Sequence, residues 1–96
     1  MYVYILECAD RSYYTGVTND IERRLCEHNN AEDSQSYTSS RLPVTLKYCG
    51  IFYDPTNAIA FEKQIKGWSR KKKEALFGTA ENWELIQKLA KKDFGK

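Results

Sequence analysis

Apolar and polar positions near the N-terminus predict a β-hairpin. Residues 2–8 are apolar at almost every position, which is typical of a strand covered on both sides of its sheet. Residues 13–18 are also β-favouring, and turn-forming residues at 9–12 separate the two segments. We therefore expect these strands to pair in antiparallel fashion. Because side chains alternate along a strand, Tyr4 and Tyr14 share one face only if even-numbered residues pair with even-numbered ones.

A helix is predicted directly after the hairpin. Asn19 is a favourable N-cap residue, and Glu22 three residues later completes a capping-box pattern. Ile21, Leu25 and His28 recur at helical spacing, so they share one face of a helix over residues 20–29.

The middle of the chain predicts a loop, a third strand and a second helix. Residues 30–40 are polar and turn-rich, which indicates a surface loop, and residues 44–53 alternate as a strand does. Asp54 and Pro55 form a strong helix start, since Asp caps and Pro suits the first helical position. The buried stripe of this helix is expected to contain Ala58, Phe61, Ile65 and Trp68.

Two further helices complete the predicted fold. Ser69 is expected to cap a short basic helix that ends at Phe77, and a last amphipathic helix is expected over residues 79–94. Its inward residues would be Trp83, Ile86, Leu89 and Ala90. The order ββα-β-ααα predicts an α+β fold, in which helices flank a small three-stranded antiparallel sheet within one domain of 96 residues.

Composition narrows the class of protein. The hydrophobic fraction of 42% fits a globular domain and argues against disorder. No apolar run reaches the length of a membrane span, and the N-terminus lacks a secretory pattern, so we expect a cytoplasmic protein outside the membrane. The three cysteines have no CxxC spacing, which favours reduced thiols over a zinc site or disulfides.

Positive charge is concentrated in one part of the chain. The first 48 residues hold five Lys or Arg against seven Asp or Glu, whereas the last 48 hold ten against six. Much of this surplus lies in residues 63–73. A basic stripe attracts phosphate backbones without reading sequence, although solvated helix faces also carry lysines.

Several motifs resemble the GIY-YIG nuclease domain. The motif pair stands as Val3-Tyr4-Ile5 and Tyr14-Thr15-Gly16, and the helix signature runs from Asn19 to Leu25. The segments Tyr37-Thr38, Arg41 to Val44 and Glu62 to Arg70 are similar to the small standalone bacterial, UPF0213-like group of that superfamily. The resemblance covers residues 2–76, and the last helix lies outside it.

The resemblance implies a metal-dependent endonuclease that hydrolyses DNA phosphodiester bonds, in DNA repair or recombination. Such hydrolysis needs an activated water, relief of negative charge and help for the leaving oxygen. The resemblance assigns these tasks to Tyr4, Tyr14, Arg24 and Glu62, with Glu62 holding a hydrated Mg²⁺ or Mn²⁺ and one tyrosine activating the water. His28, one helical turn beyond Arg24, is a further catalytic candidate.

Each candidate also has a plainer explanation. Glu62 can form a surface ion pair with Lys66 at i+4, the tyrosines can fill the sheet, and His28 can serve in packing. The residue types also suggest a wider set of DNA contacts, namely Gly16, Thr15, Thr18, Asn19, Arg41, Lys63, Lys66, Arg70 and Lys71.

Two departures from the family pattern keep other functions open. The first motif lacks its leading glycine, and the asparagine that many members have about a dozen residues after the glutamate is missing, since Asn82 lies further on. The alternative is therefore a nucleic-acid-binding module with weak or no catalysis. A third hypothesis is a protein-interaction domain that docks through its last helix. For the enzyme, the short chain favours branched, nicked or single-stranded DNA, unless a protein partner or dimerisation adds contacts.

Overall fold

The structure is a computed structural model, and it describes residues 1–29, 42–79, 82 and 84. The predicted loop at 30–40, the candidate Arg41 and most of the predicted helix over 79–94 lie outside the described residues. Within the described part of the chain, no helix is both long enough and apolar enough to cross a bilayer.

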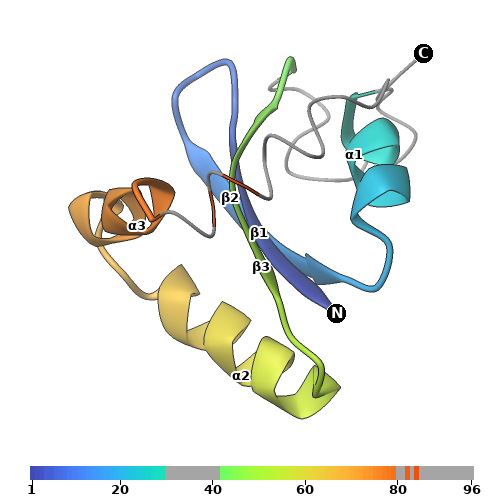
Figure 1. Cartoon of the computed structure of the whole chain (residues 1–96). Coiled ribbons are helices and arrows are strands. Elements are labelled where there is room, and N and C mark those ends of the chain that lie inside the picture. Colours follow the sequence, from blue (N-terminus) through green and yellow to red (C-terminus); the bar gives the residue numbers. More distant parts are fainter. Residues whose placement is uncertain (30–41, 80–81, 83, 85–96) are drawn as a thin grey trace.

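Three strands and three helices follow one another in the predicted order. They are β1 (Tyr2–Glu7), β2 (Tyr13–Thr18), α1 (Ile21–Asn29), β3 (Thr45–Ile51), α2 (Pro55–Lys66) and α3 (Arg70–Phe77). Figure 1 shows α1 on one side of the sheet and α2 with α3 on the other. The predicted α+β fold is confirmed.

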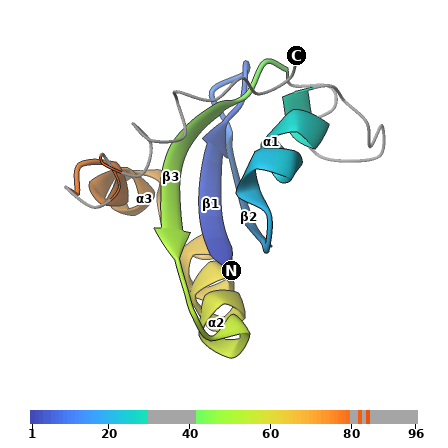
Figure 2. The same cartoon turned by 45° about the vertical axis from the view of Figure 1, so that its right-hand side comes forward.

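β1 is the central strand of the sheet. The strand order is β2-β1-β3, and both neighbours run antiparallel to β1 (Figure 2). In the hairpin Leu6 lies opposite Tyr14, and Tyr4 lies opposite Gly16. Even-numbered residues therefore pair with even-numbered ones, as predicted, and the two tyrosines share a face. β2 remains an edge strand.

The two faces of β1 belong to two different cores. On the even-numbered face, Tyr4 and Leu6 pack with Ile21 and Leu25 of α1. On the odd-numbered face, the core consists of Val3, Ile5, Ala58 and Ile65, and it is joined by Phe61 and Trp68 as the helical stripe predicted. Each of these faces removes several large apolar side chains from water, which is the main stabilising contribution in a small domain.

The cap of α1 corrects one prediction. Asp20, not Asn19, is the N-cap residue: its Oδ1 accepts a hydrogen bond of 3.1 Å from the backbone N–H of Arg23. The backbone carbonyl of Asp20 also accepts the first helical bond, from the N–H of Arg24 at 3.0 Å. The hydroxyl of Thr18 accepts from the N–H of Asp20 at 3.1 Å, which shifts the helix start by one residue.

The caps of α2 and α3 agree with the sequence patterns. Asp54 accepts a bond of 2.9 Å from the N–H of Thr56, with Pro55 at the first helical position. Ser69 accepts a bond of 3.2 Å from the N–H of Lys72. These side chains satisfy backbone donors that a helix start otherwise leaves unpaired.

Asn82 closes the outer edge of β3. Its side chain is 2% exposed, and its Oδ1 accepts a bond of 2.9 Å from the N–H of Cys49. Its Nδ2 donates to the carbonyl oxygens of Lys47 at 3.0 Å and Phe77 at 3.1 Å. The amide therefore pairs with β3 much as a neighbouring strand would. In this chain Asn82 is a structural residue at the sheet edge opposite β2.

The cysteines are free thiols, as predicted. Cys8 and Cys49 are buried, while Cys26 is half-buried. Burial raises the pKa of the Cys49 thiol to about 12, so this thiol stays protonated at neutral pH.

The cap assignment can be tested by two neighbouring substitutions. Asp20→Ala should lower the free energy of unfolding by about 1 kcal/mol, because the N–H of Arg23 loses its acceptor. Asn19→Ala, at an exposed position, should change it by less than about 0.5 kcal/mol. Urea unfolding of both variants measures the difference. A larger loss in Asn19→Ala would contradict the assignment.

Candidate active site

Three rings meet on the even-numbered face of the hairpin. The ring centroids of Tyr4 and Tyr14 lie 6.3 Å apart. The imidazole of His28 packs edge-on to both, at 5.9 Å from Tyr4 and 5.2 Å from Tyr14. β1, β2 and α1 each supply one ring, so the cluster exists only in the folded protein.

Gly16 makes room for the Tyr4 phenol. A Cβ atom at residue 16 would lie 2.5 Å from the hydroxyl oxygen of Tyr4 and 2.6 Å from its Cζ atom. No real side chain tolerates such contacts, so only glycine fits opposite Tyr4. The sequence suggested Gly16 as one of the DNA contacts. The structure instead places the Tyr4 ring over it.

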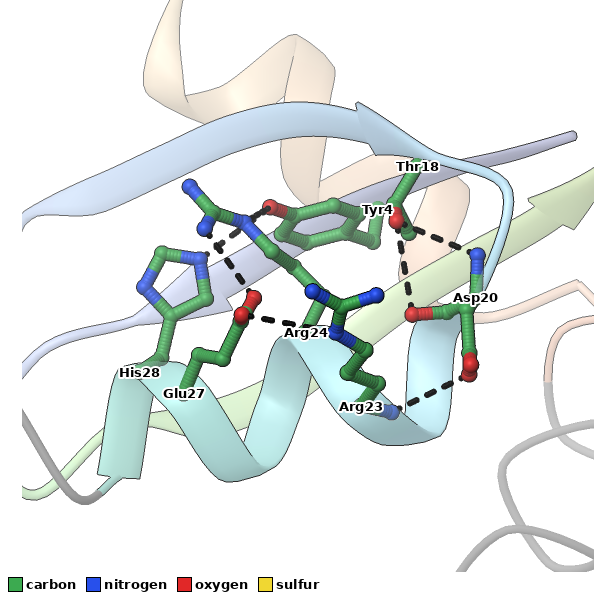
Figure 3. Close-up of polar contacts among 7 residues, drawn as sticks. All are labelled: Tyr4, Thr18, Asp20, Arg23, Arg24, Glu27 and His28. Atoms are coloured by element: carbon green, nitrogen blue, oxygen red, sulfur yellow. Dashed lines mark hydrogen bonds and ion pairs between the residues drawn. The ribbon is translucent and has the colours of Figure 1, made fainter. Parts of the chain in front are cut away.

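The Tyr4 hydroxyl is held by two partners. It lies 3.1 Å from Nε2 of His28, and it accepts a bond of 3.4 Å from Nε of Arg24 (Figure 3). Because Arg24 can only donate, we assign the phenol proton to the bond with His28, whose Nε2 is then the acceptor.

Arg24 is positioned from both sides. Beyond its bond to Tyr4, its Nη1 lies 3.3 Å from Oε1 of Glu27, three residues further along α1. Figure 3 shows Arg23 on the outer side of the helix, where its Nε lies 3.6 Å from Oε2 of Glu27. The Arg23 side chain is 76% exposed, against 30% for Arg24. Arg24 therefore faces the ring cluster, whereas Arg23 faces solvent.

Burial and hydrogen bonding fix the protonation states of this cluster. Tyr4 is 1% exposed, and burial raises the pKa of its phenol to about 12, although the bond from Arg24 opposes this shift. The bonds to Tyr4, and to a lesser degree to Tyr14 and Glu27, raise the pKa of Arg24. At neutral pH Tyr4 is therefore a neutral hydrogen-bonding group, and Arg24 is a cation.

Glu62 lies on α2, the helix that covers the opposite face of the sheet. It is 6% exposed, and its Oε1 lies 2.5 Å from Nζ of Lys66. The i+4 pair foreseen for a surface glutamate does form, but the carboxylate itself is buried. The bond to Glu62 raises the pKa of Lys66, and the electrostatic interaction with Tyr14 adds to this effect.

The free edge of β2 lies between the ring cluster with Arg24 and the ion pair of Glu62 with Lys66. A cavity of about 300 Å³ lies there, and it is lined by Tyr13, Tyr14, Thr15, Lys66 and Lys73. Tyr14 belongs to the ring cluster, and Lys66 belongs to the ion pair with Glu62. The candidates thus follow one another around the edge strand, from Tyr4 and Arg24 through Tyr14 to Lys66 and Glu62.

The other candidates for DNA contacts occupy different settings. The Thr18 hydroxyl is used in the turn before α1, and Asn19 is exposed beside it. Thr15 is buried on the α2 side of the sheet. Lys63 and Lys71 are exposed on α2 and α3.

Arg70 joins α3 to the hairpin, and its side chain remains 49% exposed. Its guanidinium lies over the Tyr13 ring, 4.1 Å from the centroid, and donates to the backbone oxygen of Arg11. It also forms ion pairs with Glu7 at 3.7 Å and Glu74 at 3.4 Å. These contacts explain Arg70 by structure, so a phosphate contact is not needed to account for it.

Two residues beside the site were missed by the sequence analysis. Glu27 lies at i+3 from Arg24, a spacing at which opposite charges on a helix meet, and this signal was available. Lys73 lines the cavity, but no local pattern separates it from the other basic residues of α3.

The donor set suits a metal ion that keeps most of its water. Among the described residues, no group of three or more His, Cys, Asp and Glu side chains could hold a metal ion. Glu62 alone offers a buried carboxylate, and Mg²⁺ commonly binds through one or two carboxylates while retaining waters. Glu62 therefore fits this role, although the ammonium of Lys66 competes for the same oxygen.

Comparison with known proteins shows the family. The GIY-YIG catalytic domain matches residues 1–75, so the chain belongs to the GIY-YIG family, whose domains are nucleases. It is 49% identical over 76 residues to a UPF0213 protein of Halobacterium salinarum, covering 79% of this chain and 97% of that protein. It is 40% identical over 89 residues to a UPF0213 protein of Bacillus cereus, covering 93% and 92%.

A solved structure is also similar. The solution NMR structure of a UPF0213 protein from Bacillus halodurans matches with a TM-score of 0.53 at 41% identity, covering 85% of this chain and 90% of that chain. The expected relationship to the UPF0213 group is confirmed. The names of these relatives state no activity.

The protonation state of Tyr4 can be measured directly. In protein carrying ¹³C at the tyrosine ζ carbons, the Tyr4 signal should titrate with a pKa of about 12, because its phenol is buried. Tyr4→Phe identifies the signal. Because the pKa of Tyr4 is higher in the folded protein than in the unfolded chain, Tyr4 contributes to the free energy of unfolding below about pH 10. This contribution is lost as the pH rises toward about 12. A Tyr4 pKa at or below 10 would contradict the assignment.

Proposed function

We propose that this protein is a metal-dependent endonuclease that hydrolyses phosphodiester bonds in DNA. The observation that carries this proposal is that Tyr4, Tyr14, His28 and Arg24 converge in one cluster. Glu62 is connected to this cluster through Lys66, which lines the cavity at the edge of β2 together with Tyr14. A packing role alone gives no reason to hold a guanidinium against two phenols.

The proposal gives Arg24 the task of binding the phosphate. Its guanidinium is fixed by Tyr4 and Glu27 before any substrate arrives. A preorganised cation stabilises the negative charge of the transition state without a cost of reorganisation at that moment. Arginine also suits phosphate oxygens, because it can donate two parallel hydrogen bonds.

The two tyrosines receive different tasks. Tyr4 is buried and neutral, so it orients Arg24 and His28. Tyr14 is only half-buried and lines the cavity beside Lys66, so it is the phenol that can contact the attacking water. Both Arg24 and Lys66 interact with it, so two cations lie beside this phenol.

Glu62 would hold the Mg²⁺ or Mn²⁺ ion. When bound, the ion supplies charge neutralisation to the phosphate and the leaving oxygen. Without a metal ion, Lys66 neutralises the buried carboxylate of Glu62. The Lys66 side chain is 58% exposed, so it is able to move away from Glu62 when a metal ion binds.

Branched, nicked or single-stranded DNA is the proposed substrate, in DNA repair or recombination. The described residues carry no separate module for reading bases, which favours recognition of shape over sequence. Incubation of the protein with labelled flap, nicked, single-stranded and duplex DNA, in Mg²⁺, Mn²⁺ or EDTA, tests the activity.

A second function is a nucleic-acid-binding module with weak or no catalysis. Two observations favour it: Glu62 is already bonded to Lys66, and Asn82 is used to close β3. Salt-sensitive binding of DNA in EDTA, with no cleavage in any metal ion, would favour this function over the enzyme.

Glu62→Gln should abolish metal-dependent cleavage. The amide keeps the shape but is a poor ligand for Mg²⁺, so we expect a fall of about a hundredfold or more at unchanged fold. Gel assays measure cleavage, and circular dichroism checks the fold. Glu84→Gln, at an exposed position, is the matched control. Cleavage in EDTA, or full activity in Glu62→Gln, would contradict the mechanism.

Lys66→Met should strengthen metal binding at Glu62. Without the ammonium the carboxylate has no competing cation, so the affinity for Mn²⁺, measured by EPR titration, should rise several-fold. The apo variant should lose about 1 kcal/mol of stability, because a buried carboxylate loses its partner, and Mn²⁺ should restore it. Lys63→Met, on the exposed side of α2, is the control. Unchanged or weaker Mn²⁺ binding in Lys66→Met would contradict the competition.

A further inference from the structure

The cavity at the edge of β2 has the composition of an anion site. Its five lining residues are two tyrosines, one threonine and two lysines, and no carboxylate is among them. Lys66 comes from α2 and Lys73 from α3, so two ammonium groups meet at one strand edge, although that of Lys66 is paired with Glu62. About 300 Å³ is more than a phosphate group needs, which leaves room for part of the attached sugar.

Thr15, one of the residues that line the cavity, has a buried hydroxyl without a partner among the described residues. Thr15 is 5% exposed, and its Oγ1 is the buried side-chain atom that, among the described residues, has no hydrogen bond. Buried polar atoms in proteins are nearly always hydrogen-bonded, so a partner outside the chain is to be expected. A phosphate oxygen could accept a hydrogen bond from the Thr15 hydroxyl while the other oxygens of the phosphate face Lys66 and Lys73.

Lys73 differs from its neighbours on α3. Arg70 is engaged by Glu7 and Glu74, and the ammonium of Lys72 lies over the Trp68 ring at 4.6 Å from the centroid. Lys73 is half-buried at the cavity and forms no ion pair among the described residues. Its charge is therefore available to a ligand in the cavity.

The cavity adjoins the ring cluster but lies around the edge from it. Tyr14 and Thr15 are neighbours in β2, so their side chains point to opposite faces of the sheet. Both can line one cavity because β2 has no strand on its outer side. Tyr14 lines the cavity and also interacts with Arg24, so a DNA strand bound at Arg24 would reach the cavity by passing around the free edge of β2.

We propose that Thr15, Lys66 and Lys73 form a second phosphate subsite, which binds a backbone phosphate next to the one that is cleaved. The inference rests on the proposed function for the identity of its ligand, a nucleic-acid backbone. Its role is to anchor the strand, so it operates without metal and without catalysis. Binding measured in EDTA is therefore separable from cleavage.

Thr15→Val tests the hydroxyl. We probe the full chain in EDTA with inorganic phosphate, followed by ¹H–¹⁵N NMR, and with a fluorescent single-stranded oligonucleotide. Valine keeps the shape but cannot donate, so affinity for both probes should fall about tenfold. The melting temperature should stay equal or rise, because an unpaired buried hydroxyl has been removed. A purely structural threonine would show the reverse: lower stability and unchanged binding.

Lys73→Met and Lys71→Met form a matched pair on α3. Each removes one charge, but only Lys73 lines the cavity, so oligonucleotide binding and its salt dependence should fall more in Lys73→Met. Thr15→Ser, which keeps the hydroxyl, should bind as the parent protein does. If Thr15→Val does not fold, the comparison of Lys73→Met with Lys71→Met decides the test.

Several outcomes would overturn the inference. They are wild-type phosphate affinity in Thr15→Val, equal losses in the two lysine variants, or phosphate-induced shifts that avoid Thr15 and Lys73. If instead binding follows the expected pattern while DNA is never cleaved, the subsite stands and the proposed nuclease activity fails. If DNA is cleaved but Thr15→Val binds normally, the proposed nuclease activity stands and the subsite fails.

Discussion

The whole site depends on the burial of β1 from both sides. Its even-numbered residues pack against α1 and its odd-numbered residues against α2, so a shift of register by one residue would exchange two complete cores. That constraint fixes Tyr4 opposite Gly16, the one residue that leaves space for its ring. Once Tyr4 is fixed, its hydroxyl fixes the positions of His28 and Arg24.

The edge position of β2 is the second constraint, and it makes the site accessible. A central strand is covered on both sides by neighbours, whereas an edge strand lets side chains from its two faces meet around its free border. Here that border brings the ring cluster on the α1 side close to the ion pair on the α2 side, with Tyr14 and Lys66 lining one cavity. The closed edge, at β3, is occupied by Asn82.

Both cations at the site are held by a carboxylate of their own helix. Arg24 is bonded to Glu27 at i+3, and Lys66 is bonded to Glu62 four residues before it. The two pairs differ in which partner is buried: Glu62 is buried and Lys66 largely exposed, whereas Arg24 and Glu27 are about equally covered. This difference leaves the Lys66 side chain freer to move than that of Arg24.

The sequence by itself determined the described strands and helices, because periodicity is a local property of the chain. The pairing of even-numbered with even-numbered residues was only the condition under which Tyr4 and Tyr14 share a face. The candidates Tyr4, Tyr14, Arg24, His28 and Glu62 followed from the resemblance to the GIY-YIG domain. Tertiary structure decided the rest. Asp20 and not Asn19 is the N-cap residue of α1, because the Thr18 hydroxyl fixes the preceding turn. Arg70 contacts Tyr13 because α3 packs beside the hairpin. The burial of Glu62, the raised pKa of Tyr4 and the unpaired Thr15 hydroxyl also required the fold, since burial and long-range partners depend on which segments meet in space.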